Sequence, residues 1–175
     1  MTAPRFRGYP GERGIGGFLL LFVLMQLFAL AVLLLQTRGF LDGLRASWAL
    51  GETMPFMRPA LVVETLMNVV RMVGIPIGLL LLFRHSPGAP VYWKIFLGMT
   101  IVWAAMDVVL ILRLYAGVEA QLTAIGASID RVAAQRSTGI ENDVRLGVHA
   151  AAWLVYWSTS ERVRLTFARR AATPA

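Results

Sequence analysis

Three long apolar runs constrain this chain more than any other feature. They extend over about residues 15–35, 60–83 and 92–115, and the first contains no charged residue. A helix needs about 20 apolar residues to cross the hydrocarbon core of a bilayer. Because backbone groups in lipid must be hydrogen-bonded within their own segment, such runs predict transmembrane helices.

The composition agrees with a membrane protein that forms a single domain over residues 1–175. Of the 175 residues, 57% are hydrophobic, and the mean hydropathy is +0.64, which is too apolar for a soluble domain. The chain has no cysteine, which excludes disulfides, thiolate catalysis and Cys-ligated metal sites. The net charge is +7, but the basic residues lie mostly at the ends of the apolar runs. This distribution favours orientation in a membrane over binding of nucleic acid.

The first apolar run also has to be weighed against a secretory signal peptide, because a basic segment precedes it. The apolar core of a signal peptide has about 7–15 residues, which is shorter than this run. The sequence that follows, Gln36-Thr37-Arg38, is no small-residue cleavage site. We therefore expect an uncleaved transmembrane helix.

A fourth, shorter apolar run covers residues 144–158 and contains Arg145 and His149. The turn-forming types in residues 137–143 (STGIEND) predict a break in front of it. Between the third run and this break, apolar residues repeat at helical spacing over 118–136. That segment predicts an amphipathic helix in the loop, which lies on the membrane or caps the bundle.

The first loop, residues 36–59, shows a similar pattern. Its apolar residues recur at helical spacing and include Trp48, so we expect a short helix at the membrane surface. Tyr92, Trp93 and Tyr115 bracket the third run and are expected at headgroup depth.

Small residues mark places where helices can approach closely. Pro76 predicts a kink in the second span, and Gly74 and Gly78 on either side of it predict close packing against another helix. Gly14, Gly16 and Gly17 lack the preceding strand of a nucleotide-binding loop. They predict close packing where the first helix begins.

The distribution of arginine and lysine predicts the orientation. Four spans put both termini and the turn at 84–94 on one side, which then holds nine basic residues against seven in the other two loops. We therefore expect cytoplasmic termini and extracytoplasmic amphipathic segments.

A polar stripe runs along the second span. Glu64, Asn68 and Arg71 share one helical face, and the third span contains Asp107. At a rise of about 1.5 Å per residue, Arg71 lies about 18 Å, Asp107 about 22 Å and Glu64 about 28 Å from the turn between the two spans. These depths predict an Arg71–Asp107 ion pair in a buried polar cluster that His149 approaches from the fourth span.

This cluster has two interpretations. Charges in a membrane cost about 2.5–3.5 kcal/mol each, so a paired polar core that fixes helix packing is the simpler one. The other is a proton or solute pathway, because Glu64, Asp107 and Arg71 sum to −1 and a dry site would tend to take up a proton.

The chain ends in a basic tail that is suited to anionic lipid. Its cations are Arg162, Arg164, Arg169 and Arg170. The two histidines are far apart, and no His-x-x-x-His pattern or nucleophile elbow is present, so we expect no metal, cofactor or catalytic residue.

Residues 153–167 (WLVYWSTSERVRLTF) combine a Trp-x-x-Tyr motif with a Ser-x-Arg-Val-Arg-x-Thr-Phe ending. They resemble the Trp-x-x-Tyr and Ser-Lys-Arg-Val-Lys-x-Thr-Phe ending of the DUF2569 family of bacterial integral membrane proteins. The glycine-rich start at 14–18, the Glu64–Asn68 pair and Asp107 also match. Glu161 and Val155 stand where the family usually has Lys and Pro. The resemblance implies a four-span architecture and, because the function of the family is unknown, no activity.

The sequence therefore predicts an all-α, polytopic protein of the bacterial inner membrane with four transmembrane helices. A non-catalytic structural or partner-binding role is favoured, and a small transporter or proton pathway is the alternative. The expected partners are the lipid bilayer, anionic lipid, and a second protein or another copy of the chain, but not nucleic acid. An enzyme is disfavoured.

Overall fold

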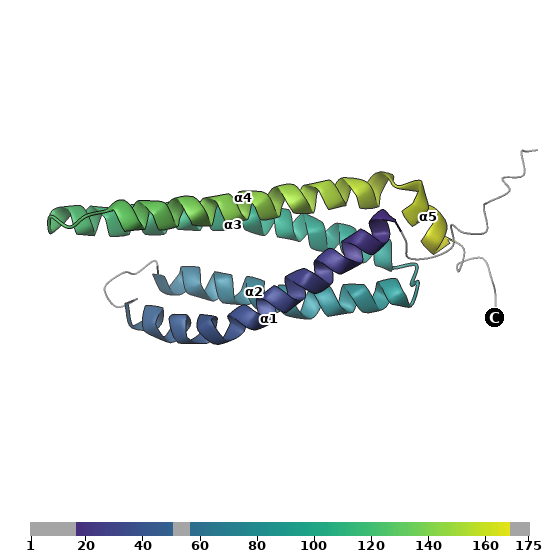
Figure 1. The fold of residues 1–175 in the computed structure, drawn as a ribbon, viewed down its shortest axis with the longest axis horizontal. Helices are drawn as coiled ribbons and strands as arrows, with labels where there is room; N and C mark the ends of the chain where they lie inside the picture. The colour runs from purple at the N-terminus through teal and green to yellow at the C-terminus, as the bar shows by residue number, and fades with distance from the viewer. Residues whose placement is uncertain (1–16, 51–56, 169–175) are drawn as a thin grey trace, which may run out of the picture.

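The computed structural model describes residues 17–50 and 57–168, without the side chains of 36–47, 49, 50 and 57. The described part is all-helical, as predicted (Figure 1). Its five helices are α1 (Phe18–Leu50), α2 (Met57–Phe83), α3 (Ala89–Ala124), α4 (Asp130–Thr159) and α5 (Glu161–Ala168).

Three helices are long and apolar enough to cross a membrane. The qualifying segments are Phe18–Leu35 of α1, Arg58–Phe83 of α2 and Ala89–Ala124 of α3, so the first three predicted runs are confirmed as candidate spans. The fourth run, 144–158, forms the second half of α4 and is not among the candidate spans of the described chain. The first half of α4 is rich in charged and polar residues, which lowers the hydropathy of the helix.

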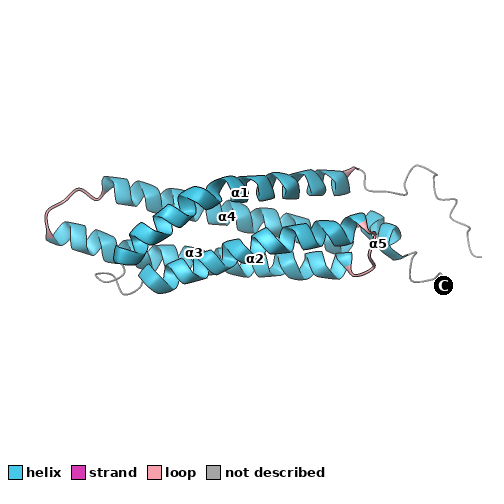
Figure 2. Ribbon diagram, turned by 90° about the horizontal axis from the view of Figure 1, so that it is seen from below, coloured by secondary structure: helices cyan, strands magenta, loops and turns pink. Residues whose placement is uncertain are grey.

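The prediction of a separate amphipathic helix over 118–136 is wrong. Helices α3 and α4 form one long antiparallel hairpin, and this segment contributes the end of α3, the turn and the start of α4 (Figures 1 and 2). The predicted break at 137–143 is also wrong, because α4 continues through it. Thr138 donates its hydroxyl to the carbonyl of Ala134 at 3.0 Å, and a Cβ at Gly139 would lie 3.1 Å from Ile111. Turn-forming residue types are thus accommodated in the helix by packing against α3.

The actual turn lies at residues 125–129. Gly126 adopts φ 72°, which favours glycine, and the N–H groups of Gly126 and Ala127 donate to the carbonyls of Thr123 and Leu122 at 3.1 and 2.9 Å. This pair of bonds is a Schellman motif, which ends a helix. Ser128 Oγ then accepts the N–H of Asp130 at 3.3 Å and helps to start α4. Gly126 followed by Ser128 and Asp130 was a readable signal in the sequence.

The short surface helix expected in 36–59 is not a separate element either. Helix α1 runs without interruption to Leu50, and residues 51–56 lie outside the described residues. Figure 1 shows α1 crossing α2 obliquely, with its beginning near the end of α4.

An aromatic core joins the helices at the end of the bundle where α1 begins. The Phe22 ring of α1 lies 4.6 Å from Trp93 of α3 and 4.9 and 5.4 Å from Trp153 and Trp157 of α4. Trp93 is 0% exposed, so the prediction that it lies at headgroup depth as a surface aromatic is corrected. Val163 and Phe167 bring α5 into the same core.

The two glycines of α2 permit this packing, as predicted. A Cβ at Gly78 would lie 2.5 Å from the ring of Trp93 and 2.7 Å from that of Tyr92, and a Cβ at Gly74 would overlap Phe96. The Tyr92 hydroxyl donates to the Gly74 carbonyl at 2.7 Å. The helical hydrogen bonding of α2 continues on both sides of Pro76.

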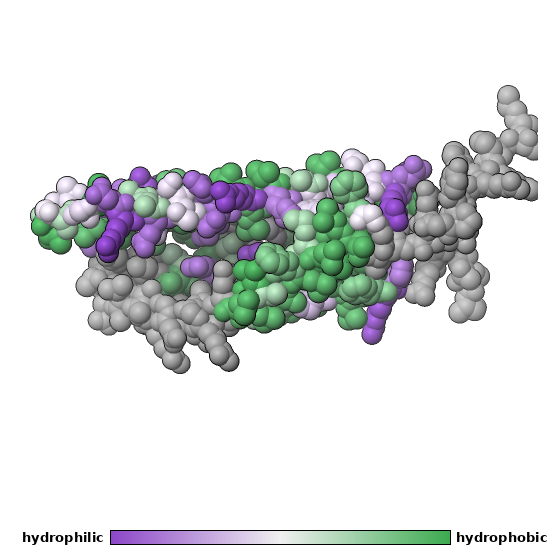
Figure 3. Space-filling view, viewed as in Figure 1, coloured by the Kyte–Doolittle hydropathy of each residue, from purple (hydrophilic) through white to green (hydrophobic). Residues whose placement is uncertain are grey.

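Among the side chains that the structure describes, the buried residues gather in one half of the molecule. Buried residues come from the beginning of α1, the end of α2, the beginning of α3 and the end of α4, with α5 added. Toward the opposite end the two hairpins diverge, and the space-filling surface is hollowed between them (Figure 3). The same view shows hydrophilic residues along the first half of α4 and hydrophobic residues over the packed half.

Candidate functional site

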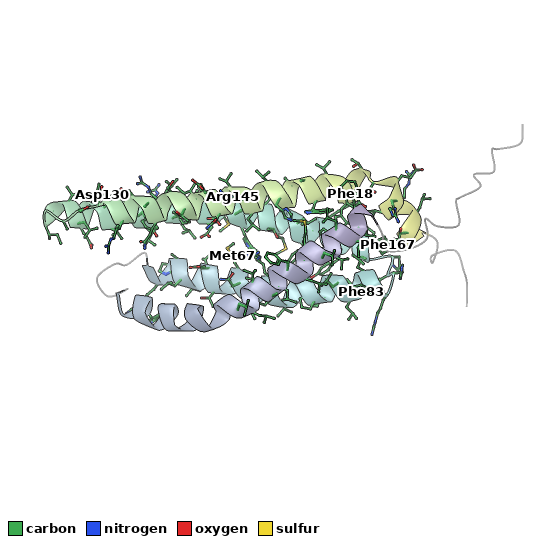
Figure 4. The ribbon with its side chains drawn as sticks, viewed as in Figure 1. Phe18, Met67, Phe83, Asp130, Arg145 and Phe167 are labelled. Carbon is green, nitrogen blue, oxygen red and sulfur yellow. The ribbon has the colours of Figure 1, made fainter. Side chains whose placement is uncertain are left out.

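The charged residues of the apolar helices interact where the packed half of the bundle meets the diverging half. Glu64 and Arg71 lie on α2, Asp107 on α3 and Asp143 on α4. Met67, between Glu64 and Arg71 in the chain, is buried and lies between the two hairpins (Figure 4). Asp143 is the residue that the other three act upon, and sequence reasoning placed it in a loop. It was missed because the turn-forming residues around it predicted a break in the helix.

Asp107 and Asp143 form a pair of neighbouring carboxyl groups. Asp143 lies within the electrostatic and hydrogen-bonding reach of Asp107, and one oxygen of Asp143, Oδ2, is buried. A hydrogen bond between two carboxyl groups requires that one of them carries the proton, because two ionised carboxylates have only acceptors. Such a bond can therefore connect α3 and α4 only while one of the two groups holds a proton.

Asp143 lies outside the candidate spans, and its pKa is raised to about 6. Burial is the main cause, followed by the negative charge of Asp107, the hydrogen bond with Asp107 and the negative charge of Glu64. The guanidinium of Arg71 acts in the opposite direction and lowers the pKa of Asp143. Residues of α2 and α3 thus act on one carboxyl group of α4.

This pKa predicts how stability depends on pH. The carboxyl of Asp143 has its ordinary pKa near 3.8 in the unfolded chain and a pKa of about 6 in the folded chain. The folded state holds the proton more tightly than the unfolded chain does. The protonated carboxyl therefore contributes its full stabilisation below about pH 4, and this stabilisation is lost as the pH rises through about 6. Asp143→Asn should remove this loss and stabilise the protein at pH 7.5 by about 1 kcal/mol, a value reduced for solvent screening.

The measurement is the unfolding midpoint in detergent between pH 4 and pH 8. Glu141→Gln is the matched control, because Glu141 is exposed and pairs only at 3.4 Å with Arg145 one turn away. An unchanged pH dependence in Asp143→Asn would contradict the assignment.

The predicted Arg71–Asp107 ion pair is not formed. No salt bridge joins them within the described chain, and the acid that acts electrostatically on Arg71 is Asp143. Counting depth along α2 and α3 could not reveal that the acid acting on Arg71 comes from α4.

The other residues of the predicted cluster are arranged differently. His149 accepts a hydrogen bond from Trp153 Nε1 at 3.0 Å through its Nε2, which makes it a neutral imidazole that faces the aromatic core. Burial also differs among these residues. Glu64 is exposed within the chain, whereas the half-buried residues are Asn68, Arg71, Asp107, Asp143 and His149. The buried polar residues of the described chain are Gln26 and Thr100. Sequence reasoning passed over Gln26 because it lies alone in an apolar run.

The basic tail divides into two parts. Arg162 is half-buried, and its guanidinium would lie 3.3 Å from a Cβ at Gly17, so the glycine at the start of α1 permits close packing, as predicted. Gly17 also adopts φ 58°. Arg164 is exposed and lies 3.6 Å from Glu161. Arg169 and Arg170 lie outside the described residues.

A further charged contact stabilises the long hairpin. Arg136 of α4 donates to Glu119 of α3, with Nη1 at 2.8 Å from Oε1 and 2.9 Å from Oε2. In the part of the chain that the structure describes, no three His, Asp or Glu side chains are grouped closely enough to hold a metal ion.

The fold and its charged residues define an α-helical protein with three helices suited to crossing a membrane. The family model of the protein of unknown function DUF2569 matches residues 12–168, and the chain belongs to this family. A search of curated proteins found no match, and a search of solved structures found none either.

Proposed function

We propose that this chain is a non-catalytic membrane protein that binds a partner protein through the tip of the α3–α4 hairpin. The tip consists of residues 118–132, from the last turns of α3 to the first turn of α4. The supporting observation is an exposed apolar surface at a place where lipid tails are not expected.

The length of α3 supports this location. A helix needs about 20 residues, or about 30 Å, to cross the hydrocarbon core. Counted from Ala89 at about 1.5 Å per residue, Val118 lies about 44 Å and Ala124 about 53 Å along an untilted α3. The tip therefore extends some 15–20 Å beyond the apolar layer if the core begins near Ala89.

The chemistry of the tip supports a protein partner. Ile125 is 76% exposed and Ile129 is 39% exposed. The same end of the hairpin carries an open cleft of about 440 Å³, which is lined by Val118, Gln121, Leu122, Ala124 and Ile125. Apolar side chains that project into water beside a shallow cleft are typical of a protein-binding surface. The rim carries charges of both signs, Glu119, Asp130 and Arg131.

Ile125→Ser should weaken partner binding about tenfold, because an exposed aliphatic anchor at the centre of an interface contributes more than 1 kcal/mol. A photo-crosslinker at position 125 should give one discrete protein adduct in native membranes, and the effect of Ile125→Ser is measured by the yield of that adduct from a crosslinker at position 122, which lines the same cleft. Val102→Ser is the matched control, because Val102 is 58% exposed on the same helix but lies at lipid depth.

An adduct of twice the chain mass would identify the partner as a second copy. Exclusively lipid adducts from position 125, as expected from position 102, would rule out the proposal.

We also propose that the second half of α4 is the fourth span and that both termini lie in the cytoplasm of a bacterium. The excess of basic residues on the side of the termini supports this orientation. The chain has no cysteine, so single cysteines at positions 125 and 165 report the side of the membrane directly. Labelling of position 165 from outside intact cells would contradict the orientation.

A proton pathway is the second candidate, and one observation favours it. The carboxyl groups of Asp107 on α3 and Asp143 on α4 are neighbours, and burial and the adjacent acids raise the pKa of Asp143 to about 6. A group with a pKa near neutrality that connects two helices can pass a proton on. Proton flux into liposomes that falls in Asp107→Asn and Asp143→Asn would support this function. Equal flux in empty liposomes would exclude it.

A further inference from the structure

An open cleft lies at the elbow between α4 and α5, on the side of the bundle where α1 begins. It has a volume of about 580 Å³ and is lined by the turn between α2 and α3, the first turns of α3, the end of α4 and α5. Trp157 and Phe167 form part of its wall, together with Ser158 and Ser160. Neither the partner-binding proposal nor the carboxyl pair uses this cleft.

Lys94 gives the cleft its charge. Its side chain is half-buried and forms no hydrogen bond or ion pair with any residue that the structure describes. The second cation, Arg164, is partly neutralised by Glu161 at 3.6 Å. Lys94, Arg164 and Glu161 leave a net charge of +1 at the cleft. A single phosphate diester, with its one negative charge, would neutralise it.

Hydroxyl groups complete an anion-binding surface. Ser158 is exposed and forms no hydrogen bond within the described chain, so its hydroxyl is free to donate. Ser160 Oγ accepts the N–H of Val163 at 3.4 Å, which leaves its proton available. Thr159 is already committed, because it donates to the Val155 carbonyl at 2.8 Å. Hydroxyl donors beside a lysine are suited to phosphate oxygens.

The position of the cleft favours the phosphate of a lipid headgroup over free phosphate. It lies where the candidate spans end at Phe83 and begin at Ala89, which is the depth of the lipid headgroups. Val91 and Ile95, on either side of Lys94 in the chain, are 59% and 60% exposed and belong to the apolar outer surface of α3. A lipid whose tails cover this surface can place its headgroup in the cleft.

We propose that the cleft at the α4–α5 elbow binds the phosphate of an anionic glycerophospholipid through Lys94, Ser158 and Ser160. The site is distinct from general attraction by the basic tail, because Lys94 belongs to α3. It also provides the apolar wall of Trp157 and Phe167 against which the glycerol backbone can lie.

The test uses the full chain in a mild detergent, with binding followed by the rise in unfolding temperature when phosphatidylglycerol is added. Lys94→Gln should weaken the apparent affinity about fivefold, as expected for the loss of one cation near a charged membrane surface. Lys94→Arg should retain most of the affinity. Arg113→Gln, which removes the same charge from an exposed site on α3 outside the cleft, should leave it unchanged.

A second pair of variants keeps the test independent of folding at position 94. Ser158→Asp adds a negative charge to the cleft at an exposed side chain and should weaken binding at least fivefold. Ser137→Asp adds the same charge to an exposed side chain of α4 in its other half and should have no effect.

Three outcomes would overturn the proposal. Equal losses in each variant and its control would mean that only net charge matters. Equal stabilisation by phosphatidylcholine would remove the requirement for an anionic headgroup. Stabilisation by inorganic phosphate at the same concentration, sensitive to Lys94→Gln, would show that the site takes a free anion instead of a lipid.

Discussion

Gly78→Ala should strongly destabilise the packed half of the bundle, although it adds a single methyl group. Its Cβ would lie 2.5 Å from the ring of Trp93 and 2.7 Å from the ring of Tyr92. Neither ring can yield, because Trp93 is 0% exposed and Tyr92 is tied to Gly74 by its hydroxyl. Overpacking of this kind costs about 1–3 kcal/mol and sometimes more, and we expect about 3 kcal/mol.

The measurement is the free energy of unfolding in mixed micelles, followed by tryptophan emission. Gly98→Ala is the matched control, because Gly98 is also helical and a Cβ there would meet nothing within 4 Å. That variant should be neutral or stabilised by up to about 1 kcal/mol, since alanine has the higher helix propensity. Similar midpoints for the two variants would mean that α2 and α3 are not in the close contact described.

Phe22→Ala is expected to have a comparable effect for the opposite reason, since it leaves a cavity. Phe22 is 0% exposed and its ring contacts Trp93, Trp153 and Trp157. Lipid surrounds separated membrane helices, so little hydrophobic transfer energy is lost and the cost arises from lost packing. We expect about 3 kcal/mol, the lower end of the range for Phe→Ala in protein cores.

Phe28→Ala provides the comparison, because Phe28 lies on the same helix and is 72% exposed. It should change the stability by less than about 0.5 kcal/mol. The tryptophan emission of Phe22→Ala should also shift to longer wavelength, since water or detergent reaches the indoles. Equal effects at positions 22 and 28 would contradict the aromatic core.

The packing roles of residues that are far apart in the chain became clear only from the tertiary structure. The run 153–167 was recognised as a family resemblance, but the structure shows why several of its residues are apolar. Much of the aromatic core is formed by Trp153, Trp157 and Phe167, and Val163 packs beside them. Arg162 packs over the beginning of α1. The sequence pattern could not indicate that α5 folds back onto this core.

Local physical chemistry determined what the sequence could reveal alone. The length and hydropathy of three runs predicted helices that can cross a membrane, and Gly74 and Gly78 predicted a close helix contact. These properties depend on the chemistry of neighbouring residues along one helix. The same reasoning failed at 137–143, because residues that favour turns in isolation are held in α4 by contacts with α3.

Only the tertiary structure decided which charged groups meet. The sequence placed Glu64, Arg71 and Asp107 at similar depths, but Asp143 comes to them from a helix whose start and register were misjudged. Asp143 adds a further negative charge to these three residues, and burial and the neighbouring acids raise its pKa. Electrostatic interaction depends on distance in space, and spacing along a chain determines that distance only within a single helix.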